Sequence, residues 1–447
     1  MKDNVQYSEN SHVSGWEDKM IVRSKMRESS QAGSVLIFII VAMTIVAIMG
    51  AAIMSLTSSS TFSGLFINNR HNAYYLAQAG RNYATMTILN AYNSADVAVI
   101  TALNGQTFTL PDGNKFYLTT KKESAGITTV ESTGIANPGT ATETKQKIVF
   151  TVRDPTVISG AASTGIFKLS GGAVIDGYSS VGGHVYNEAE DKTKNLAVIR
   201  TNTCTTGGVS LTASSVVYGK AYCGATCAAA DPCDALGGIF VCYSGSTIKL
   251  GTALSETNYP TPVLSIPAGG ELKTIIGSED SLQNKVTNIG VAGTVTKYRA
   301  RNDSGGTELH VNNSIINIYG DVTLIVDYQL YMTNGAKIVL HDNATLVLWI
   351  NELLSASGSS TLNIRADGVT PGEPPNLLIK GIEVTTLTFN NTGRIYCSIY
   401  APGADLNVDG TSEVFGSFYA RNISLNNGAK LHCDMALSEG ADQYGGY

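Results

Sequence analysis

The hydrophobic positions of this chain begin as one uninterrupted run and later become a repeating pattern. Residues 34–56 are almost wholly apolar, and no Asp, Glu, Lys or Arg occurs from Ser29 to Asn69. As a helix, residues 34–56 span about 35 Å, which is enough to cross the hydrocarbon core of a bilayer. The pattern therefore predicts a membrane-spanning helix near the N-terminus.

Basic residues flank this run on one side. The preceding cations are Lys19, Arg23, Lys25 and Arg27, and the next one is Arg70. By the positive-inside rule, the N-terminus stays in the cytoplasm and everything after residue 56 is exported. The alternative is a secretory signal peptide, whose apolar region is usually about 7–15 residues long and ends in a small-residue cleavage site. Here the run is longer and Gly33 comes before it, which favours the membrane helix.

The helical pattern becomes amphipathic beyond the membrane run. Apolar residues recur every three or four positions at Leu76, Ala79, Tyr83 and Met86, and such a stripe needs a surface to pack on. Four segments that alternate or carry β-branched residues follow between turn residues, at 107–110, 116–119, 128–131 and 147–152. We therefore predict a helix over 34–95 and a small β-sheet domain over 96–155. An ordinary α+β domain is the alternative.

After residue 155 a second pattern recurs. Each copy has two apolar residues two positions apart, then a small polar residue, then an apolar residue eight positions after the first, and often Gly two positions later. The copies start at Phe167, Val209, Ile316, Leu330, Leu387, Leu406 and Ile423. Their later apolar members are Ile175, Val217, Leu324, Ile338, Ile395, Val414 and Leu431.

This repeat indicates stacked β-coils. Alternate positions of a strand point inward, and the polar residues permit corners, so each copy is typical of one coil of a β-solenoid, or β-helix. The copies at Leu387, Leu406 and Ile423 predict coils of 17–19 residues there. The predicted fold class is α+β: a long N-terminal hydrophobic helix, the small β-domain, then a β-solenoid over 156–437. An irregular insertion at about 225–310 and a tail over 438–447 complete it, and an antiparallel β-sandwich is the alternative.

Several segments resemble one known family. A basic leader, then Gly33, then Ser34 and an apolar run resembles the class III leader of type IV pilins and pseudopilins. Residues 73–84 resemble the second half of the N-terminal helix of PilX-type minor pilins. Residues 173–180 and 399–405 through 431–434 resemble the β-helical domain of uncharacterised function that follows such N-termini. The β-domain over 96–155 is then pilin-like.

The resemblance implies processing and a location. A prepilin peptidase would remove residues 1–33 after Gly33 and leave Ser34 first, although Met20 or Met26 could be the true start. The membrane helix would include Val35, Leu36, Phe38, Ile39, Ile40, Val41, Ile45, Val46 and Ile48. The protein would be single-pass in the inner membrane with an exported C-terminal domain, or would lie on the cell surface or pilus after processing.

One departure from the family narrows the expected role. Major pilins carry Glu at the fifth mature position, where this chain has Phe38. An unpaired charge in an apolar filament core is costly, so the family's Glu needs a partner. Without it, the resemblance implies a minor pilin-like subunit that displays its β-helix for assembly priming or adhesion. Expected partners are the inner membrane, prepilin peptidase, other pilins, and a surface or glycan ligand.

Charge and cysteines add further expectations. A net charge of −6 and the absence of a long Lys/Arg run exclude nucleic-acid binding. A cluster of five cysteines predicts disulfides in an insertion loop of an exported protein: Cys204, Cys223, Cys227, Cys233 and Cys242. A zinc site is the alternative, but no CxxC pair or intervening His supports it. Cys397 and Cys433 hold equivalent repeat positions with Gly416 between them, so two coils, about 9.6 Å, should keep them unbonded.

Catalytic and cofactor sites are not expected. The carboxylates that an enzyme of polysaccharides would need have candidates in Asp176, Asp405, Asp409 and Asp434. These lie in or beside turns, where Asp commonly accepts backbone hydrogen bonds. The histidines, including His184, His310, His341 and His432, show no metal-ligand spacing. A membrane-tethered carbohydrate-active enzyme and a self-associating surface scaffold are the alternative functions.

Overall fold

The computed structural model describes residues 31–94, 97–124, 126–157, 160–180, 184–227, 238–243, 245–254, 264, 267–269, 271–274, 281–301, 308–367, 370–382 and 386–437. Residues 1–30 of the predicted leader, the tail over 438–447 and Cys233 lie outside this set. The chain divides into two compact units, residues 1–68 and 69–447, which we describe separately.

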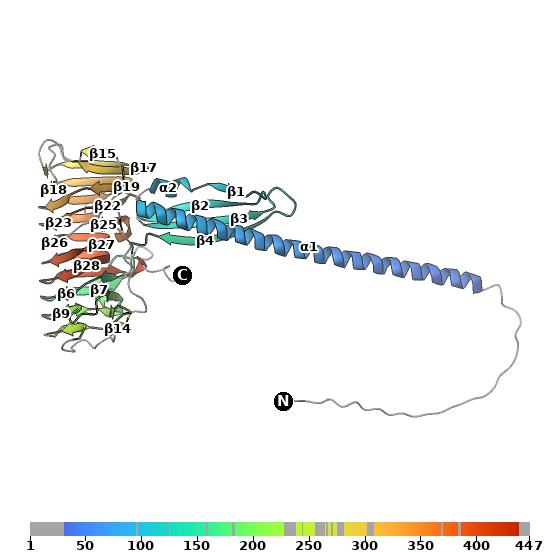
Figure 1. The fold of residues 1–447 in the computed structure, drawn as a ribbon, viewed down its shortest axis with the longest axis horizontal. Coiled ribbons are helices and arrows are strands. Elements are labelled where there is room, and N and C mark those ends of the chain that lie inside the picture. The colour runs from blue at the N-terminus through green and yellow to red at the C-terminus, as the bar shows by residue number, and fades with distance from the viewer. Residues whose placement is uncertain are drawn as a thin grey trace, which may run out of the picture. The chain divides into compact units, whose positions relative to one another are not determined.

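Helix α1 (Gln31–Ser94) carries the long apolar run (Figure 1). Within Leu36–Tyr92 it is long and apolar enough to cross a membrane, and its most apolar stretch has no buried residue. Its hydroxyl groups bond within the helix, as when Thr44 Oγ1 donates to Ile40 O at 2.8 Å. The prediction of a long apolar N-terminal helix is confirmed, and its side chains present an apolar surface on all sides.

A small antiparallel sheet follows the helix. Its strands, in spatial order, are β1 (Thr107–Thr109), β2 (Lys115–Ser124), β3 (Ile127–Ala136) and β4 (Thr144–Arg153). The short helix α2 (Val97–Ala102) precedes them. Burial alternates strictly along β3, so one face of the sheet is covered. The four segments that the sequence pattern selects lie in these strands.

The C-terminal part of α1 covers that face with small residues. A buried residue recurs every three or four positions: Ala73, Ala77, Gly80, Ala84, Ile88 and Ala91. The predicted stripe is wrong beyond Leu76, because Ala79, Tyr83 and Met86 are exposed. Helix α1 packs on the sheet through the face that has the smallest side chains, because that face allows the closest approach.

Two glycines mark this close approach. A Cβ on Gly80 would lie 2.3 Å from Ser132 Oγ, and a Cβ on Gly134 would lie 2.0 Å from Ala73 O. Ser132 Oγ also donates to Ala77 O at 2.8 Å, which ties the sheet to the helix backbone. The helix and the sheet therefore touch backbone to backbone.

The rest of the chain is a β-rich domain of parallel strands. It opens with β5 (Ala161–Ser163), β6 (Phe167–Leu169), β7 (Val174–Tyr178), α3 (Glu188–Lys194), β8 (Ala197–Thr201), β9 (Val209–Leu211), β10 (Val216–Val217), β11 (Gly219–Cys223), β12 (Phe240–Cys242), β13 (Thr247–Ile248) and β14 (Thr252–Leu254). Next come β15 (Glu271–Thr274), β16 (Ser281–Gln283), β17 (Val286–Arg301), β18 (Glu308–Asn312), β19 (Ile315–Val326), β20 (Gln329–Thr333), β21 (Lys337–Leu340), β22 (Thr345–Ile350), β23 (Leu353–Ser357) and β24 (Thr361–Ile364). It ends with η2 (Pro374–Asn376), β25 (Leu377–Gly381), β26 (Thr386–Asn390), β27 (Arg394–Asp409), β28 (Glu413–Leu425), β29 (Lys430–Asp434) and η3 (Met435–Leu437).

These strands stack in layers of three. β5, β6 and β7 pair in parallel with β8, β9 and β10, which pair in turn with β11, β12 and β13. We call the three outer surfaces the first-, second- and third-strand faces, in this order. The prediction of a β-rich domain after the helix is thereby confirmed, with parallel pairing between layers.

The layers do not stack in chain order. β28 pairs with β5 and β6, and β29 pairs with β7, so the last layer lies on the first. We call this contact the seam. β14 belongs to one end of the stack, and β15 and β16 belong to the other. Figure 1 shows the result as yellow, orange and red strands followed by green ones.

The predicted irregular insertion is therefore too broad. Between residues 225 and 310 the structure has parallel strands β12 to β17 and the start of β18. The connection from β14 to β15 joins the two ends of the stack, and of its residues the structure describes 264 and 267–269. Leu264 in this connection packs against two hydrophobic clusters, one that includes Trp349 and one that includes Tyr400 and Tyr419.

The register confirms most of the predicted repeat. One buried column contains, in spatial order, Leu330, Leu354, Leu387, Leu406, Ile423, Phe167 and Val209. Ile316 is wrong as a start, because it pairs with the later member Ile338. The first apolar residue of that copy is Leu309, which pairs with Leu330 and lies seven residues before Ile316. The pattern also misses the copy that starts at Leu354, because its second apolar position is occupied by the small residue Ala356.

Two ion pairs, one buried and one partly exposed, fix the small sheet to the parallel domain within residues 69–447. Lys380 Nζ lies 2.6 Å from Asp154 Oδ2 and 5.0 Å from the centre of the Trp349 ring. Lys122 Nζ lies 2.8 Å from Asp321 Oδ1. These contacts join β4 to β25 and β2 to β19, so the two sheets form one packed body.

Candidate functional site

An outward column of buried side chains crosses the seam on the third-strand face. Tyr396, Phe415, His432 and Asp176 are successive register partners. The Tyr396 and Phe415 rings stack at 4.7 Å, and the Phe415 and His432 rings at 4.3 Å. All four side chains are buried, so the column packs one layer on the next.

Asp176 ends this column as a shared acceptor. Its Oδ1 lies 2.6 Å from His432 Nδ1, and its Oδ2 accepts from the Tyr186 hydroxyl at 2.6 Å. Burial and this bond raise the pKa of Tyr186 far above its usual value. Asp434 is also buried and accepts from Ser180 N. Asp176 therefore bonds His432 across the seam and Tyr186 on its own side of it, which corrects our placement of it as a turn residue.

The other two carboxylates do act as turn acceptors. Asp405 accepts from Arg421 Nε at 2.9 Å and from Asn422 Nδ2 at 2.8 Å. The hydrogen bond from Arg421 lowers the pKa of Asp405. Asp409 accepts from Gly410 N and Asn427 Nδ2, both at 2.7 Å. These bonds hold corners between neighbouring layers, as the turn interpretation predicts.

The four histidines named above, of six in the chain, make separate contacts. His184 pairs with Asp191 at 3.0 Å, and the His310 ring stacks on Tyr331 at 4.7 Å. His341 Nε2 lies 3.2 Å from Asn317 Oδ1. Within the described ranges, no group of three or more His, Cys, Asp or Glu side chains is placed to hold a metal.

Two neighbouring pockets open beside the third-strand face. The larger has a volume of about 440 Å³ and is lined by Lys122, Glu123, Asp321, Leu340, His341, Asp342, Asn343, Ala344, Thr345, Asn363, Arg365, Gly372, Glu373 and Asn376. The smaller, of about 120 Å³, is lined by Tyr178, Ser180, His184, Val185, Tyr186, Arg365, Thr370, Pro371, Gly372, Glu373, Pro374, Arg394, Tyr396 and Phe415. Arg365, Gly372 and Glu373 line both, so the pockets meet there. We call the pair the double pocket.

Sequence reasoning missed the double pocket, although a signal for it exists. Leu354 and Leu387 are register partners 33 residues apart, whereas the following layers are 17–19 residues long. The excess length forms the loop that carries Arg365, Gly372 and Glu373. A long interval between equivalent repeat positions thus marks an insertion, and insertions commonly carry function.

A ladder of alternating charges lies next to the smaller pocket. Arg394 pairs with Glu413 at 3.0 Å, Glu413 with Lys430 at 3.0 Å, and Lys430 with Glu188 at 3.3 Å. Lys192 then pairs with Glu188 within α3. Hydrogen bonds from Lys192 and Lys430 lower the pKa of Glu188. The ladder ties α3 to the layers on the other side of the seam.

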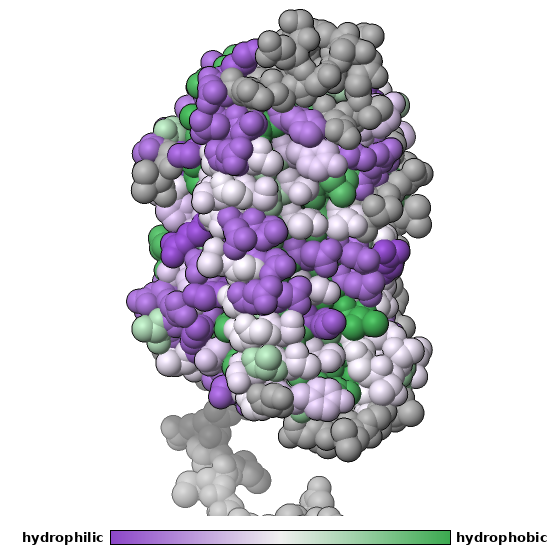
Figure 2. Space-filling view, turned by 90° about the vertical axis from the view of Figure 1, so that its left-hand side faces the viewer, coloured by the Kyte–Doolittle hydropathy of each residue, from purple (hydrophilic) through white to green (hydrophobic). Residues whose placement is uncertain are grey.

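The second-strand face carries small polar side chains. Its central outward column includes Ser355, Thr388, Asn407, Ser424, Lys168 and Ser210 in consecutive register. Figure 2 shows this side of the molecule, where hydrophilic and weakly polar residues predominate. Lys168 is the charged member of the column, so hydroxyl and amide groups set the character of this face.

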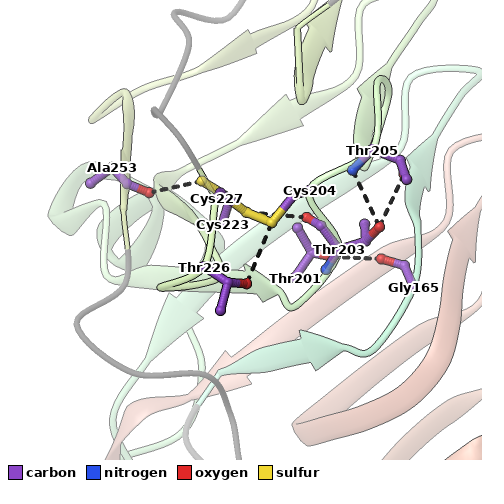
Figure 3. Close-up of a disulfide and its surroundings, with 9 residues drawn as sticks. All are labelled: Gly165, Thr201, Thr203, Cys204, Thr205, Cys223, Thr226, Cys227 and Ala253. Atoms are coloured by element: carbon purple, nitrogen blue, oxygen red, sulfur yellow. Dashed lines mark hydrogen bonds between the residues drawn. A yellow bond between two sulfur atoms is a disulfide. The ribbon is translucent and has the colours of Figure 1, made fainter.

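One disulfide is present in the described part of the cysteine cluster (Figure 3). Cys204 and Cys227 are bonded, with their Cα atoms 5.1 Å apart. Cys242 is disulfide-bonded as well. Cys223 does not belong with the disulfide candidates: it is a buried thiol whose Sγ donates to Ala253 O at 3.9 Å. The bonded pair secures the loop beside β8 and β11.

Cys397 and Cys433 remain thiols, as predicted. Gly416 is the register partner of both, so one whole layer separates them. Both are fully buried, and burial raises the pKa of each thiol well above its usual value. They act as small core residues.

The expected processing residues lie at the start of α1. Gly33 and Ser34 are in its first turn, and the helix continues without a break through the membrane residues predicted above. Phe38, at the fifth position after Gly33, is 75% exposed. The segment thus offers an aromatic, uncharged side chain at this position.

Comparisons with known proteins give a partial match. Residues 277–440 match a family model described as a domain of unknown function (DUF7305), a range that includes β16 to β29. No curated protein matches the chain. An ice binding protein from an Antarctic bacterium Flavobacteriaceae is 12% identical, over 62% of this chain and 82% of that chain, with a TM-score of 0.21. The competence-associated pilin ComZ from Thermus thermophilus is 11% identical, over 83% and 93%, with a TM-score of 0.25. Scores this low carry no argument.

Proposed function

We propose that this protein is a minor pilin-like structural subunit, cut after Gly33 and anchored by α1, which displays its parallel β-domain outside the inner membrane. The observation that carries the proposal is the uncharged, bilayer-length apolar helix that starts next to Gly33. A water-exposed surface of this kind is unfavourable by about 25 cal/mol per Å². Lipid or the apolar helices of other pilins would cover it.

The small sheet supports this role. The helix does not end at the membrane run but continues into the segment that packs on β2, β3 and β4 through Ala84, Ile88 and Gly80. One helix that includes both the anchor and the sheet-packing segment suits a subunit that carries an exported domain. The phenyl ring of Phe38 keeps the anchor uncharged, which fits a minor position in an assembly.

We further propose that the stacked layers are a β-solenoid with a binding role, for adhesion or assembly priming. Each layer buries its apolar positions only through its neighbours, as solenoid coils do. Asp405 and Asp409 are engaged in corner contacts, and Asp176 is buried. These placements favour binding over catalysis.

Processing in cells tests the proposal. The full chain is expressed in bacteria with and without an active prepilin peptidase, and the N-terminus of the membrane-bound product is determined by mass spectrometry. We expect Ser34 to be first, free or methylated, only when the peptidase is active. Gly33→Glu should block the cut, because the enzyme would meet a bulky charged residue in place of glycine.

A second glycine provides the control. A Cβ on Gly50 meets no atom within 4 Å, so Gly50→Ala should be cut like the natural chain. An uncut chain in cells with active peptidase, or a cut after the apolar run, would contradict the proposal. Protection of the C-terminal domain from protease added to spheroplasts would contradict export.

A further inference from the structure

The double pocket has the size and construction of a ligand site. Its larger part, about 440 Å³, falls within the range of roughly 300–1,000 Å³ that is usual for ligand pockets. Because Arg365, Gly372 and Glu373 line both parts, one ligand can contact both. An extended molecule therefore suits the site better than a single small one.

The loop between the two parts is held in place by its backbone. Arg365 N donates to Thr370 O at 2.9 Å, and Gly372 N donates to Asn363 O at 3.0 Å. Asn363 Nδ2 bonds both Glu373 O and Tyr396 O, at 2.7 and 2.8 Å. A Cβ on Gly372 would lie 2.0 Å from Asn363 Oδ1. These contacts preorganise the described residues on either side of 368–369 before any ligand binds.

The charges of the larger part disfavour ionic ligands. Its lining has two cations and four carboxylates, a balance that repels polyanions. Asp321 is already paired with Lys122 at 2.8 Å, and Glu373 with Arg365 at 3.3 Å. These carboxylates are already paired and bind a basic peptide weakly. Their remaining lone pairs, and the remaining N–H groups of Lys122 and Arg365, can still bond hydroxyls.

The smaller part adds apolar surface. Its lining includes the partly exposed side chains of Tyr186 and Pro371, together with the buried side chains of Tyr178, Tyr396, Phe415 and Pro374. A polar wall that continues into an aromatic and proline wall matches a sugar chain, which has hydroxyl groups and apolar C–H surfaces in alternation. A lipid would leave the polar wall unsatisfied.

We propose that the double pocket binds a strand of a neutral polysaccharide, with sugar hydroxyls on the larger part and a ring on the smaller. This deepens the proposed function by naming the ligand class of the displayed domain. Binding by purified protein does not depend on cleavage after Gly33, so the two proposals fail separately.

The test uses the full chain in detergent and isothermal titration calorimetry. The neutral probes are cellohexaose, chitohexaose and xylohexaose, and the charged probes are hexagalacturonate and hexalysine. We expect at least one neutral hexamer to bind. Arg365→Ala and Asp342→Ala should each weaken that binding about tenfold, because each substitution removes one charged side chain that hydrogen-bonds the hydroxyl groups of the sugar.

Arg421 provides a matched control. Its side chain is 49% exposed and paired with Asp405, much as that of Arg365 is 53% exposed and paired with Glu373, but it does not line the double pocket. Arg421→Ala should bind like the natural chain, and melting curves of all variants check folding. The proposal is overturned if no neutral hexamer binds, if only hexagalacturonate or hexalysine binds, or if Arg365→Ala equals the control.

Discussion

At the scale of single residues, the pair between Lys380 and Asp154 places a lysine and a carboxylate together in the interior. The Lys380 side chain is 1% exposed, so both charges have lost their water. Asp154 also accepts from Thr156 N and Thr156 Oγ1, and Lys380 reaches Tyr92 O at 3.3 Å. Such a pair adds little over apolar residues of the same shape, but leaving one half of it alone is costly.

This asymmetry predicts the behaviour of variants. Lys380→Met should lower the free energy of unfolding by about 3–5 kcal/mol, because it leaves the Asp154 carboxylate buried without its cation. Adding Asp154→Leu should restore a large part of that loss. Urea unfolding followed by Trp349 fluorescence measures both, since Lys380 lies on this ring.

The control is an exposed lysine in a similar pair. Lys121 bonds Glu123 at 2.8 Å and its side chain is 75% exposed, so Lys121→Ala should change stability by less than about 1 kcal/mol. If Lys380→Met behaved like this control, the pair would not be buried in solution.

At the scale of elements, helix α1 combines two different packing rules. Its first part is apolar on all sides, whereas the part that meets the small sheet uses residues chosen for lack of bulk. This is why spacing alone gave the wrong stripe: Tyr83 and Met86 are apolar enough to predict burial, but Gly80 and Ala84 permit closer contact. Periodicity indicates a face, and steric fit decides which one.

Gly80 carries a direct test of that fit. Gly80→Ala adds a Cβ 2.3 Å from Ser132 Oγ and 2.8 Å from Phe116 Cδ2, so it should destabilise the folded domain by about 1–3 kcal/mol. The usual preference of a helix for Ala over Gly acts the other way by about 0.5–1 kcal/mol. Thermal unfolding monitored by circular dichroism measures the net loss.

Gly64 separates the two effects. It lies in the same helix, and a Cβ there meets nothing within 4 Å, so Gly64→Ala should be neutral or stabilising. Equal melting temperatures for Gly80→Ala and Gly64→Ala would show that the helix does not approach the sheet as closely as described.

At the scale of the whole molecule, the sequence allowed the layers to be predicted but not their order. The buried column through Leu387, Leu406 and Ile423 follows from apolar spacing alone, because neighbouring copies in the chain are neighbours in space. The copy that starts at Phe167 has the same pattern as the others, so its sequence does not predict that Phe167 stacks on Ile423. For the same reason, the contact between Asp176 and His432 could not be predicted. Both stand nine positions after a repeat start, but only the stacking order brings them together.

The seam can be tested by cross-linking. Lys168 and Ser424 are outward register partners on the second-strand face, although 256 residues separate them in the chain. Paired residues on adjacent parallel strands lie about 4.8 Å apart, within reach of a disulfide. The double variant Lys168→Cys and Ser424→Cys should therefore form a bond under mild oxidation, detected as a linked peptide in a non-reducing digest.

A third position distinguishes the seam from random contact. Thr388 lies in the same outward column as Ser424, with Asn407 between them, so it is three layers, or about 14 Å, from Lys168. Lys168→Cys with Thr388→Cys should stay unlinked, because this distance exceeds the reach of a disulfide. If this second pair linked and the first did not, the first layer would not stack on the last. The N-terminal layers would then have to extend the stack elsewhere, and the buried contact between Asp176 and His432 could not form.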